Sequence, residues 1–460
     1  MVPDPVNGPG RPQTARLFRC LDVPTLSLAF AAAILISNSA VRFIRARLFE
    51  FDCPTYWPLS IFWFRTPRWK QLLFAVALGV ALHFITIYLS RVKRVLPFVV
   101  LIGMALVLGT TAIQGWVRGF ELPITGVWKP GLEYYHDAIQ IKDALSFLRE
   151  YEQVQPNLLV HSRTHPPGAV LSIYLLLEVL GKPAFLSIAI AVVSVCLSCL
   201  FLYRMMSTTY GANGFAGYVT LLFVLMPAVQ IYYLASIDAL IASLLLGVLY
   251  LSLFAKPSVW ATLGAVLFLF LASFLTFGFV FVVPVVVGFE LIRRHGLRRS
   301  GTALLGLVLI YLLVYRFFGF NYLHSFAIAS ADQNPQGFRL LMEPATYFFT
   351  RLEGIAEIAL FLGPFLAALS IRGLRMTKRL RSDLLLLAWL GISTLLVMLL
   401  AGVFPTGETA RACLFVQPFL IFPVAVYLRE ARASHKDQAV LLHLVFAQTL
   451  LMQTFGTFAW

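Results

Sequence analysis

The residues best suited to chemistry lie in one polar stretch between positions 133 and 168. It contains three histidines, two arginines and several carboxylates, whereas the sequence on either side is strongly apolar. Ionisable side chains are costly beside lipid, and membrane proteins usually retain them for a function. This stretch is therefore the first candidate for a functional site.

The sharpest pair within it is His136-Asp137. An aspartate at the edge of the membrane, beside a histidine, is suited to act as a general base with a raised pKa. We predict Asp137 as the catalytic base, with His136 beside it. The alternative is structural, because an aspartate at this position can also cap the N-terminus of a helix predicted over 138–149.

His161, Arg163 and His165 alternate along the chain, so an extended backbone would direct all three side chains to one side. Arg163 together with a histidine can hold a phosphate group. Two histidines with a carboxylate can instead bind a divalent metal. If a cation such as Mg²⁺ or Mn²⁺ is present, we expect its ligands to be Asp137, His165 and Asp238. A third interpretation is a polar loop at the lipid head-group boundary.

Further polar residues stand at the ends of apolar segments. Asp238 begins one such segment, where it either caps a helix together with Ser236 or supplies a second acid to the same cavity. Glu408 and Arg411 lie between two other segments and either pair with each other or offer Arg411 to an anionic ligand. In the polar loop 318–354, the predicted substrate contacts are His324, Asp332, Gln333 and Arg339.

The composition indicates which elements must position these residues. The chain has 460 residues, of which 60% are hydrophobic and 12% charged, and its mean hydropathy is +0.83. Repeated apolar segments of about 20 residues predict an all-α, polytopic transmembrane bundle of about 11 to 13 spans without a separate soluble domain. The candidate spans are 23–42, 71–90, 95–114, 184–203, 213–233, 238–254, 258–275, 278–292, 302–317, 355–371, 384–402, 411–428 and 438–455.

The net charge of +15 comes from basic residues in short runs between the apolar segments. This is the positive-inside pattern, so we expect membrane lipids as partners and no nucleic acid. From residue 91 onward it places the basic loops in the cytosol. The segments 115–183, 318–354 and 406–411 and the turn at Asp238 then share the outer face.

Two domains follow from these patterns: a Pro/Gly-rich, disordered cytosolic tail over 1–22 and a single membrane domain over 23–460. The segment 115–183 is predicted as the first large outer loop, carrying juxtamembrane helices such as 166–181. The loop 43–70 is basic although the alternation puts it outside, which leaves the topology of residues 1–90 open.

Several motifs resemble the GT-C superfamily of integral-membrane glycosyltransferases, which includes protein O-mannosyltransferases and aminoarabinose transferases. They are Tyr135-His136-Asp137, Thr164-His165-Pro166-Pro167-Gly168, Arg204 with Tyr210-Gly211, and Ser236-Ile237-Asp238-Ala239, in the family's order over roughly residues 130–290. The turn Gly407-Glu408-Thr409-Ala410-Arg411 is similar to an acid-x-x-Arg turn of bacterial members. The chain departs from many relatives in having His136-Asp137 where they have Asp-Glu.

The resemblance implies an inverting transfer from a polyprenyl-phosphate sugar donor to a glycan, lipid or protein acceptor. It implies an extracytoplasmic site in a bacterial inner or plasma membrane. Asp137 would activate the acceptor, and Arg163 and Arg411 would stabilise the leaving phosphate, with His161 or His165 as hydrogen-bond donors. The alternatives are a transporter or flippase of a lipid-linked or anionic substrate, which would carry charges near mid-membrane on several spans, and an oligosaccharide polymerase or ligase.

Overall fold

The computed structural model describes residues 62–89, 91–126, 134–211, 214–294, 296–335, 337–403 and 408–458. The predicted tail 1–22, the predicted span 23–42 and the positions Glu133 and Gly407 lie outside these residues. Within them the chain is an all-α bundle with a single two-stranded ribbon, formed by β1 (Phe62–Phe64) and β2 (Gly456–Phe458).

The all-α, polytopic fold is confirmed. In the described residues, six helices are long and apolar enough to cross a membrane: α2 (Trp69–Leu89), α3 (Val95–Ala112), α9 (Pro183–Tyr210), α15 (Arg298–Phe318), α20 (Asp383–Leu400) and α23 (His435–Phe455). Shorter apolar helices complete the bundle: α8 (Gly168–Leu180), α10 (Gly214–Leu225), α12 (Ile237–Leu253) and α13 (Val259–Leu275). The protein is therefore a multi-pass integral membrane protein.

Two predicted spans are interrupted in the structure. The segment 213–233 divides into α10 and α11 (Pro227–Tyr232), because Met226 precedes a proline and adopts an extended conformation. The predicted span 355–371 is not one continuous helix. There α18 (Pro344–Leu362) and α19 (Pro364–Arg375) meet at a bend of 104°, at Gly363, whose φ of +93° favours glycine.

The remaining elements are short or follow the predicted spans closely. They are η2 (Val117–Glu121), α4 (Leu122–Thr125), α5 (Tyr134–Ala138), α6 (Ala144–Val154), η3 (Gln155–Asn157), α7 (Val160–Arg163), η4 (Phe277–Phe281), α14 (Val282–Arg293), α16 (Tyr322–Gln333), α17 (Arg339–Met342), η5 (Met376–Lys378), α21 (Thr409–Ala412), η6 (Leu414–Val416) and α22 (Gln417–Glu430).

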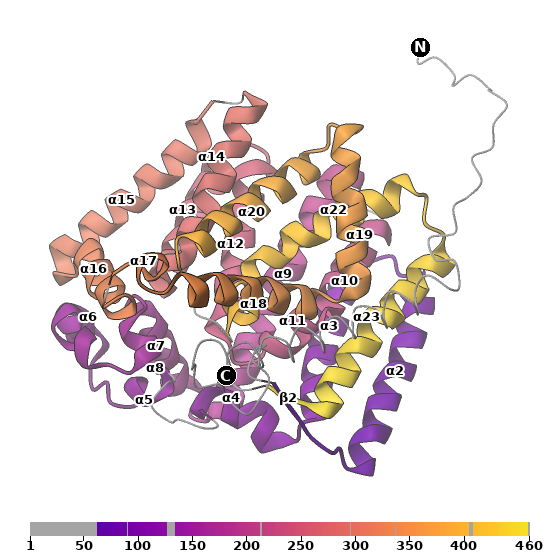
Figure 1. Cartoon of the computed structure of the whole chain (residues 1–460), viewed down its shortest axis with the longest axis horizontal. Coiled ribbons are helices and arrows are strands. Elements are labelled where there is room, and N and C mark those ends of the chain that lie inside the picture. The colour runs from indigo at the N-terminus through magenta and orange to yellow at the C-terminus, as the bar shows by residue number, and fades with distance from the viewer. Residues whose placement is uncertain are drawn as a thin grey trace.

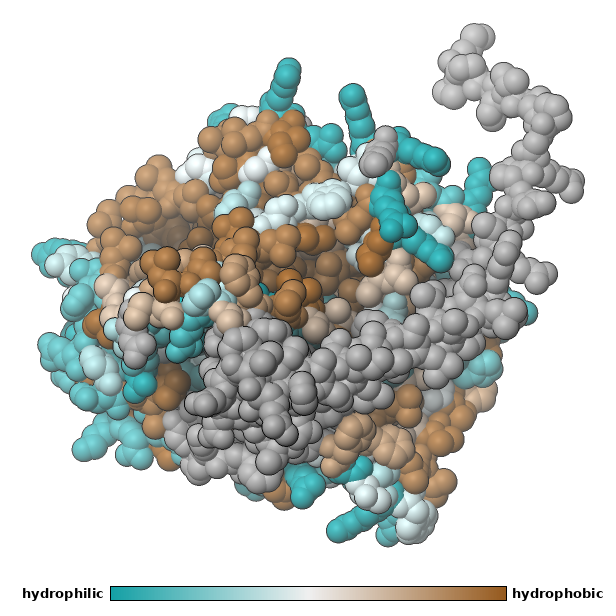
Figure 2. Space-filling view, viewed as in Figure 1, coloured by the Kyte–Doolittle hydropathy of each residue, from teal (hydrophilic) through white to brown (hydrophobic). Residues whose placement is uncertain are grey.

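Helix α12 lies near the centre of the bundle, packed against α9 and α13. Its Gly247 allows this close packing, since a Cβ atom there would lie 2.8 Å from ring atoms of both Phe201 and Phe268. At the periphery α15 exposes Leu305, Leu309 and Leu312 by more than half of each side chain, as expected of a lipid-facing surface. Figure 2 shows apolar surface over the middle of the bundle and hydrophilic residues toward its ends.

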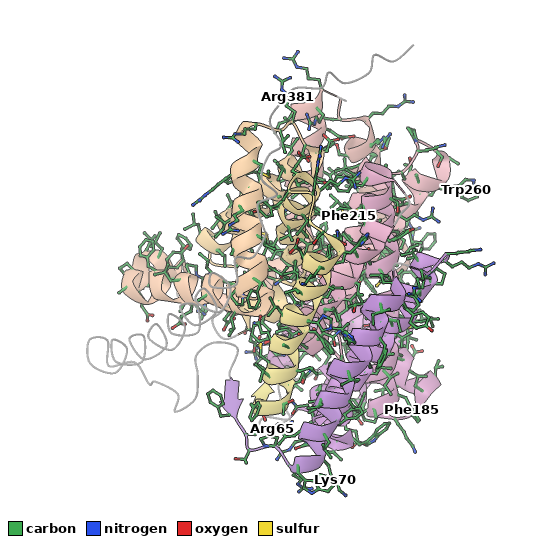
Figure 3. All side chains as sticks on the ribbon, turned by 90° about the vertical axis from the view of Figure 1, so that its right-hand side faces the viewer. Arg65, Lys70, Phe185, Phe215, Trp260 and Arg381 are labelled. Atoms are coloured by element: carbon green, nitrogen blue, oxygen red, sulfur yellow. The ribbon has the colours of Figure 1, made fainter. Side chains whose placement is uncertain are left out.

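The helices cross the bundle in alternating directions, which separates two ends. The basic end carries the C-termini of α14, α19 and α22 and the N-termini of α15, α20 and α23, with their arginines and lysines. The polar end carries α4, α5, α7 and β2 (Figure 1). Figure 3 shows Arg381 at the basic end and Arg65 and Lys70 at the polar end.

Arg65 belongs to the basic loop 43–70, which the positive-inside rule does not explain, and its contacts give it a different role. Its Nε donates to the carbonyl of Thr454 at 3.0 Å, and its Nη2 donates to that of Gln453 at 3.1 Å. Both carbonyls belong to the last turn of α23. A guanidinium at this position satisfies free carbonyls and complements the helix dipole, so Arg65 has a structural role on the polar end.

Candidate functional site

An ion-pair cluster lies at the polar end, formed by residues from three separate parts of the sequence. Arg411 Nη2 lies 3.0 Å from Glu408 Oε2, and Arg411 Nε lies 3.4 Å from Asp238 Oδ2. His161 Nε2 lies 3.5 Å from the same oxygen of Glu408. We call His161, Asp238, Glu408 and Arg411 the Arg411 cluster. The structure thus brings together four of the residues predicted from the sequence.

Asp238 is positioned by the first turn of α12. Ser236, not Asp238, is the N-cap residue, and its hydroxyl accepts from the backbone N–H of Asp238 at 3.1 Å. The same hydroxyl donates to Asp238 Oδ2 at 3.1 Å. Ala235 precedes this cap with φ of +65°, a conformation that non-glycine residues adopt at a cost. Asp238 is therefore held by the turn and remains directed at Arg411.

Helix α18 positions α21, which carries Arg411. The Glu357 carboxylate accepts from the backbone N–H of Ala410 at 3.2 Å. Gly354 lets the two helices approach, because a Cβ atom there would lie 3.0 Å from Thr409 Oγ1. Neither Glu357 nor Gly354 was predicted from the sequence. The available signal was a carboxylate, Glu357, inside the otherwise apolar segment 355–371 that was predicted as a span.

Charge balance within the cluster favours ionised Glu408. Burial by itself would raise the pKa of Glu408, but the positive charge of Arg411 and the hydrogen bond from His161 outweigh it and lower the pKa to about 2. Because Arg411 faces two carboxylates, the cluster places a fixed cation beside acceptor oxygens at one end of the bundle. Such a site can exchange one carboxylate contact for an anionic or hydroxyl-bearing ligand.

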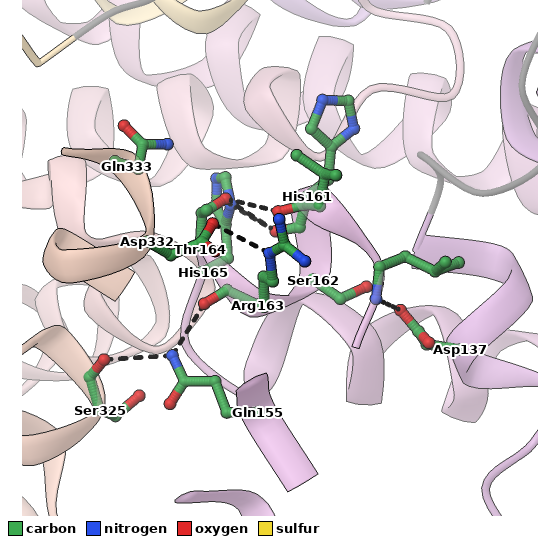
Figure 4. Close-up of polar contacts among 12 residues, drawn as sticks. Asp137, Gln155, His161, Ser162, Arg163, Thr164, His165, Ser325, Asp332 and Gln333 are labelled. Carbon is green, nitrogen blue, oxygen red and sulfur yellow. Dashed lines mark hydrogen bonds and ion pairs between the residues drawn. The ribbon is translucent and has the colours of Figure 1, made fainter. Parts of the chain in front are cut away.

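The segment 161–165 is helical at its start, so the prediction of an extended backbone is wrong. Arg163 N–H donates to the carbonyl of Leu159 at 2.9 Å, which closes a helical turn. Residues two apart on a helix point in different directions, whereas residues four apart share a face. His161 and His165 both contact the Tyr134 ring, with centroids 6.0 and 5.5 Å from it. Arg163 pairs with Asp332 instead (Figure 4).

His165 is held neutral beside the cluster. Its Nδ1 donates to the carbonyl of His161 at 2.9 Å, and the ring of Tyr134 packs edge-on against it with centroids 5.5 Å apart. Burial, followed by the proximity of His161, lowers the pKa of His165 to about 4. With Nδ1 carrying the proton, Nε2 of His165 is an acceptor at neutral pH. Tyr134 was not predicted as a site residue.

Arg163 pairs with α16 instead of joining the cluster. Its Nε lies 2.9 Å from Asp332 Oδ2, and both side chains remain about one-third exposed, at 32% and 31%. The buried Gln155 strengthens this link, because its Nε2 donates to the carbonyls of Arg163 and Ser325. An ion pair this exposed is weak, so Arg163 can release Asp332 for a stronger anion.

Gln333 and Arg339 lie next to this pair. Gln333 ends α16 beside Asp332, and its carbonyl accepts from Arg339 Nη2 at 3.3 Å. Both residues therefore belong to the neighbourhood of Arg163 rather than to the contacts of Arg411.

The pair His136-Asp137 is on α5, against α7. Asp137 Oδ2 accepts from the backbone N–H of Leu159, the N-cap residue of α7, at 3.1 Å. His136 Nε2 donates to the carbonyl of Thr125 at 2.8 Å. The predicted helix 138–149 is wrong, because α6 begins only at Ala144 and its cap is Asp143, which accepts from Ser146 N–H.

The predicted metal ligands do not form a coordination group. Among the residues that the structure describes, no three or more His, Cys, Asp and Glu side chains are arranged to hold a metal ion. Asp137, His165 and Asp238 are not brought together in such a group, and we derive no step that uses a metal.

The fold and these contacts define an integral membrane protein with a charged cluster at one end of an apolar helical bundle. No protein-family model matches the chain, and no curated protein matches it in sequence.

Proposed function

We propose that this protein is a membrane glycosyltransferase of the GT-C type, which transfers a sugar from a polyprenyl-phosphate donor to an acceptor with inversion. The observation that carries the proposal is the contact network at the polar end. Asp137 on α5, the histidines around α7 and Asp238 at the start of α12 bear the motifs that resemble this superfamily. The contacts of Leu159, Glu408 and Arg411 join them in space.

The proposed step needs a base for the acceptor and cations for the leaving group. The acceptor hydroxyl gives its proton to Asp137 while its oxygen attacks the anomeric carbon. The bond from that carbon to the donor phosphate breaks, and the electron pair leaves with the polyprenyl phosphate. Cations placed where this charge develops stabilise the transition state, which assigns Arg411 of the cluster. Arg163 would join it only on releasing Asp332. One oxygen of Asp137 is held by Leu159, so its carboxylate is fixed in direction.

The histidines have different roles in this proposal. His161 Nε2 faces the Glu408 carboxylate and is suited to donate a hydrogen bond to the phosphate. His165, with its lowered pKa, offers an acceptor nitrogen and orients His161 through the bond to the His161 carbonyl. The sequence left open whether His161 or His165 donates the hydrogen bond to the phosphate, and we assign this role to His161.

The distribution of charge supports an extracytoplasmic site. The positive-inside rule directs the basic end to the cytosol, which puts the polar end on the outer face of the proposed bacterial inner or plasma membrane. A polyprenyl chain would lie among the helices in the bilayer, and its phosphate would reach the polar end. The acceptor is a glycan, lipid or protein presented at that face.

A transporter or flippase of an anionic substrate is the second candidate. Glu290 on α14 and Arg351, Glu353 and Glu357 on α18 are buried charged residues, as a translocation path requires. Glu290 accepts from Ser300 N–H in the first turn of α15 at the basic end, however, and the other three belong to one helix, whereas a carrier distributes such groups over several spans around a central site. An oligosaccharide polymerase or ligase would use similar chemistry at the outer face. The identity of the acceptor distinguishes it from the proposed enzyme.

The proposal is tested with the full chain in proteoliposomes containing a panel of polyprenyl-phosphate sugars and acceptors. We expect release of polyprenyl phosphate together with sugar transfer from one class of donor. Passage of the intact donor across the bilayer without cleavage would favour the transporter. Transfer at the wild-type rate by a variant lacking both Asp137 and Arg411 would contradict the assigned site.

A further inference from the structure

A large cavity lies at the basic end, at the opposite end of the bundle from the Arg411 cluster. It has a volume of about 1120 Å³ and is bounded by the C-terminal turns of α2 and α22 and the N-terminal turns of α10 and α23. Figure 3 faces α2 and α23 and labels Phe215, which lines the cavity. Nothing in the proposed transfer reaction uses this cavity.

The charge of the cavity is one-sided. Its described lining includes the cations Arg91, Arg429 and Lys436, and none of its described lining residues is acidic. The nearby Asp437 does not line it, and the Asp437 carboxylate is occupied in the capping box with Ser434. Uncompensated cations at a cavity wall favour an anionic ligand.

Two buried polar atoms at the cavity lack hydrogen-bond partners among the described residues. The Tyr218 side chain is only 2% exposed, and its hydroxyl has no partner. His443 Nδ1 donates to the carbonyl of Ala439 at 2.7 Å, whereas its buried Nε2 has none. A buried hydroxyl without a partner destabilises the fold. Both residues line the cavity, so a ligand oxygen there would satisfy the Tyr218 donor.

One wall of the cavity is apolar and extends to the lipid-facing surface, although the lining also includes the polar residues Thr86, Ser434 and Gln438. Leu89, Phe215, Leu442 and Leu444 contribute buried or partly buried apolar area. Val440, also in the lining, is 40% exposed, and Phe84 on the adjacent turn of α2 is 57% exposed. The cavity therefore combines an anion-selective polar part with an apolar part at the level of the membrane.

We propose that this cavity binds an anionic phospholipid of the leaflet at the basic end. The phosphate would accept from Tyr218 and lie near Arg429 and Lys436, and the acyl chains would follow the apolar wall between α2 and α23. A lipid fits better than free phosphate because a large part of the lining is apolar. Anionic lipids of the cytosolic leaflet also concentrate beside basic residues at this depth. The inference does not depend on the proposed transfer reaction.

The test uses the purified full chain in neutral detergent, with bound lipid measured by native mass spectrometry during titration with phosphatidylglycerol. We expect phosphatidylglycerol to bind at least tenfold more tightly than phosphatidylcholine. Tyr218→Phe should weaken binding about tenfold without changing the net charge, because one hydrogen bond to a charged group is lost. Lys436→Gln should weaken it about fivefold.

Arg381→Gln is the matched control, because Arg381 is an exposed arginine of the basic end that does not line the cavity. It should bind phosphatidylglycerol like the wild type. Equal binding by the wild type, Tyr218→Phe and Lys436→Gln would overturn the proposal. Inorganic phosphate should not displace the lipid at equal concentration, and displacement would overturn the assignment to a phospholipid. Each variant is used only if its thermal unfolding in detergent shows that it is folded. If one of the two cavity variants fails this check, Arg429→Gln takes its place.

Discussion

Arg411 Nε lies 3.4 Å from Asp238 Oδ2, so an ion pair joins α21 to the first turn of α12. The two residues are 173 positions apart in the sequence (411 − 238). Their side chains are 13% and 23% exposed, which makes the pair largely shielded from water. Because Arg411 also binds Glu408, it connects the two carboxylates of the cluster. The predictions below start from this arrangement.

Removing the cation should abolish transfer. Arg411→Gln deprives the leaving phosphate of its charge partner, and we expect the transfer rate to fall by at least about 100-fold. It also leaves two shielded carboxylates without their cation, at a cost of about 1–3 kcal/mol in the free energy of unfolding. Arg149→Gln, at an exposed arginine of α6, is the matched control, and its stability should stay within about 0.5 kcal/mol of wild type. Wild-type turnover by Arg411→Gln would refute the role of the cluster.

Replacing the proposed base should separate catalysis from folding. In Asp137→Asn the amide oxygen can still accept from Leu159 N–H, so the start of α7 should keep its position. The loss of a general base should lower the transfer rate about 10²- to 10⁴-fold. Asp143→Asn makes the same change at the N-cap of α6 and should leave the rate unchanged. Activity measured with an authentic donor, alongside thermal unfolding in detergent, decides between the two roles.

Glu357 should act through the placement of α21. Glu357→Ala leaves the Ala410 N–H without this acceptor, and we expect a loss of about 1–3 kcal/mol in stability together with weaker donor binding. Glu357→Gln keeps an acceptor oxygen and should restore most of both. A rise in KM for the donor that is relieved in the glutamine variant is the expected signature. Equal defects in the two variants would show that the hydrogen bond is not what matters.

Acidification should destabilise the protein through His165. Its pKa falls from 6.5 in the unfolded chain to about 4 in the folded protein, mainly by burial. Between these values the unfolded chain binds a proton that the folded protein does not, so stability decreases as the pH falls from 6.5 to 4. The expected loss is about 1–3 kcal/mol, measured as a falling Tm in detergent.

His165→Asn should flatten this dependence, because its amide can still donate to the His161 carbonyl but does not titrate. Glu408 contributes in a lower window, since its pKa is depressed from 4.5 to about 2 and its stabilisation is lost only as the pH falls through that range. An unchanged Tm slope between pH 6.5 and 4 in His165→Asn would assign the effect to other groups.

The sequence alone determined where most of the long apolar helices run. An apolar segment in lipid must satisfy its own backbone hydrogen bonds, so hydropathy fixes where spans such as 71–90 and 384–402 run, and they correspond to α2 and α20. The basic runs then indicate which ends share a side. Both signals are local, and each can be read from a window of about 20 residues.

Only the tertiary structure decided which polar residues meet. The alternation of His161, Arg163 and His165 suited an extended backbone, but a helical turn at α7 sends Arg163 to Asp332 and leaves the histidines beside Tyr134. The contact of Glu357 with α21 depends on how closely α18 packs against α21, which the absence of a side chain at Gly354 permits. Such contacts join residues far apart in sequence. They therefore depend on how the helices pack, which no local pattern records.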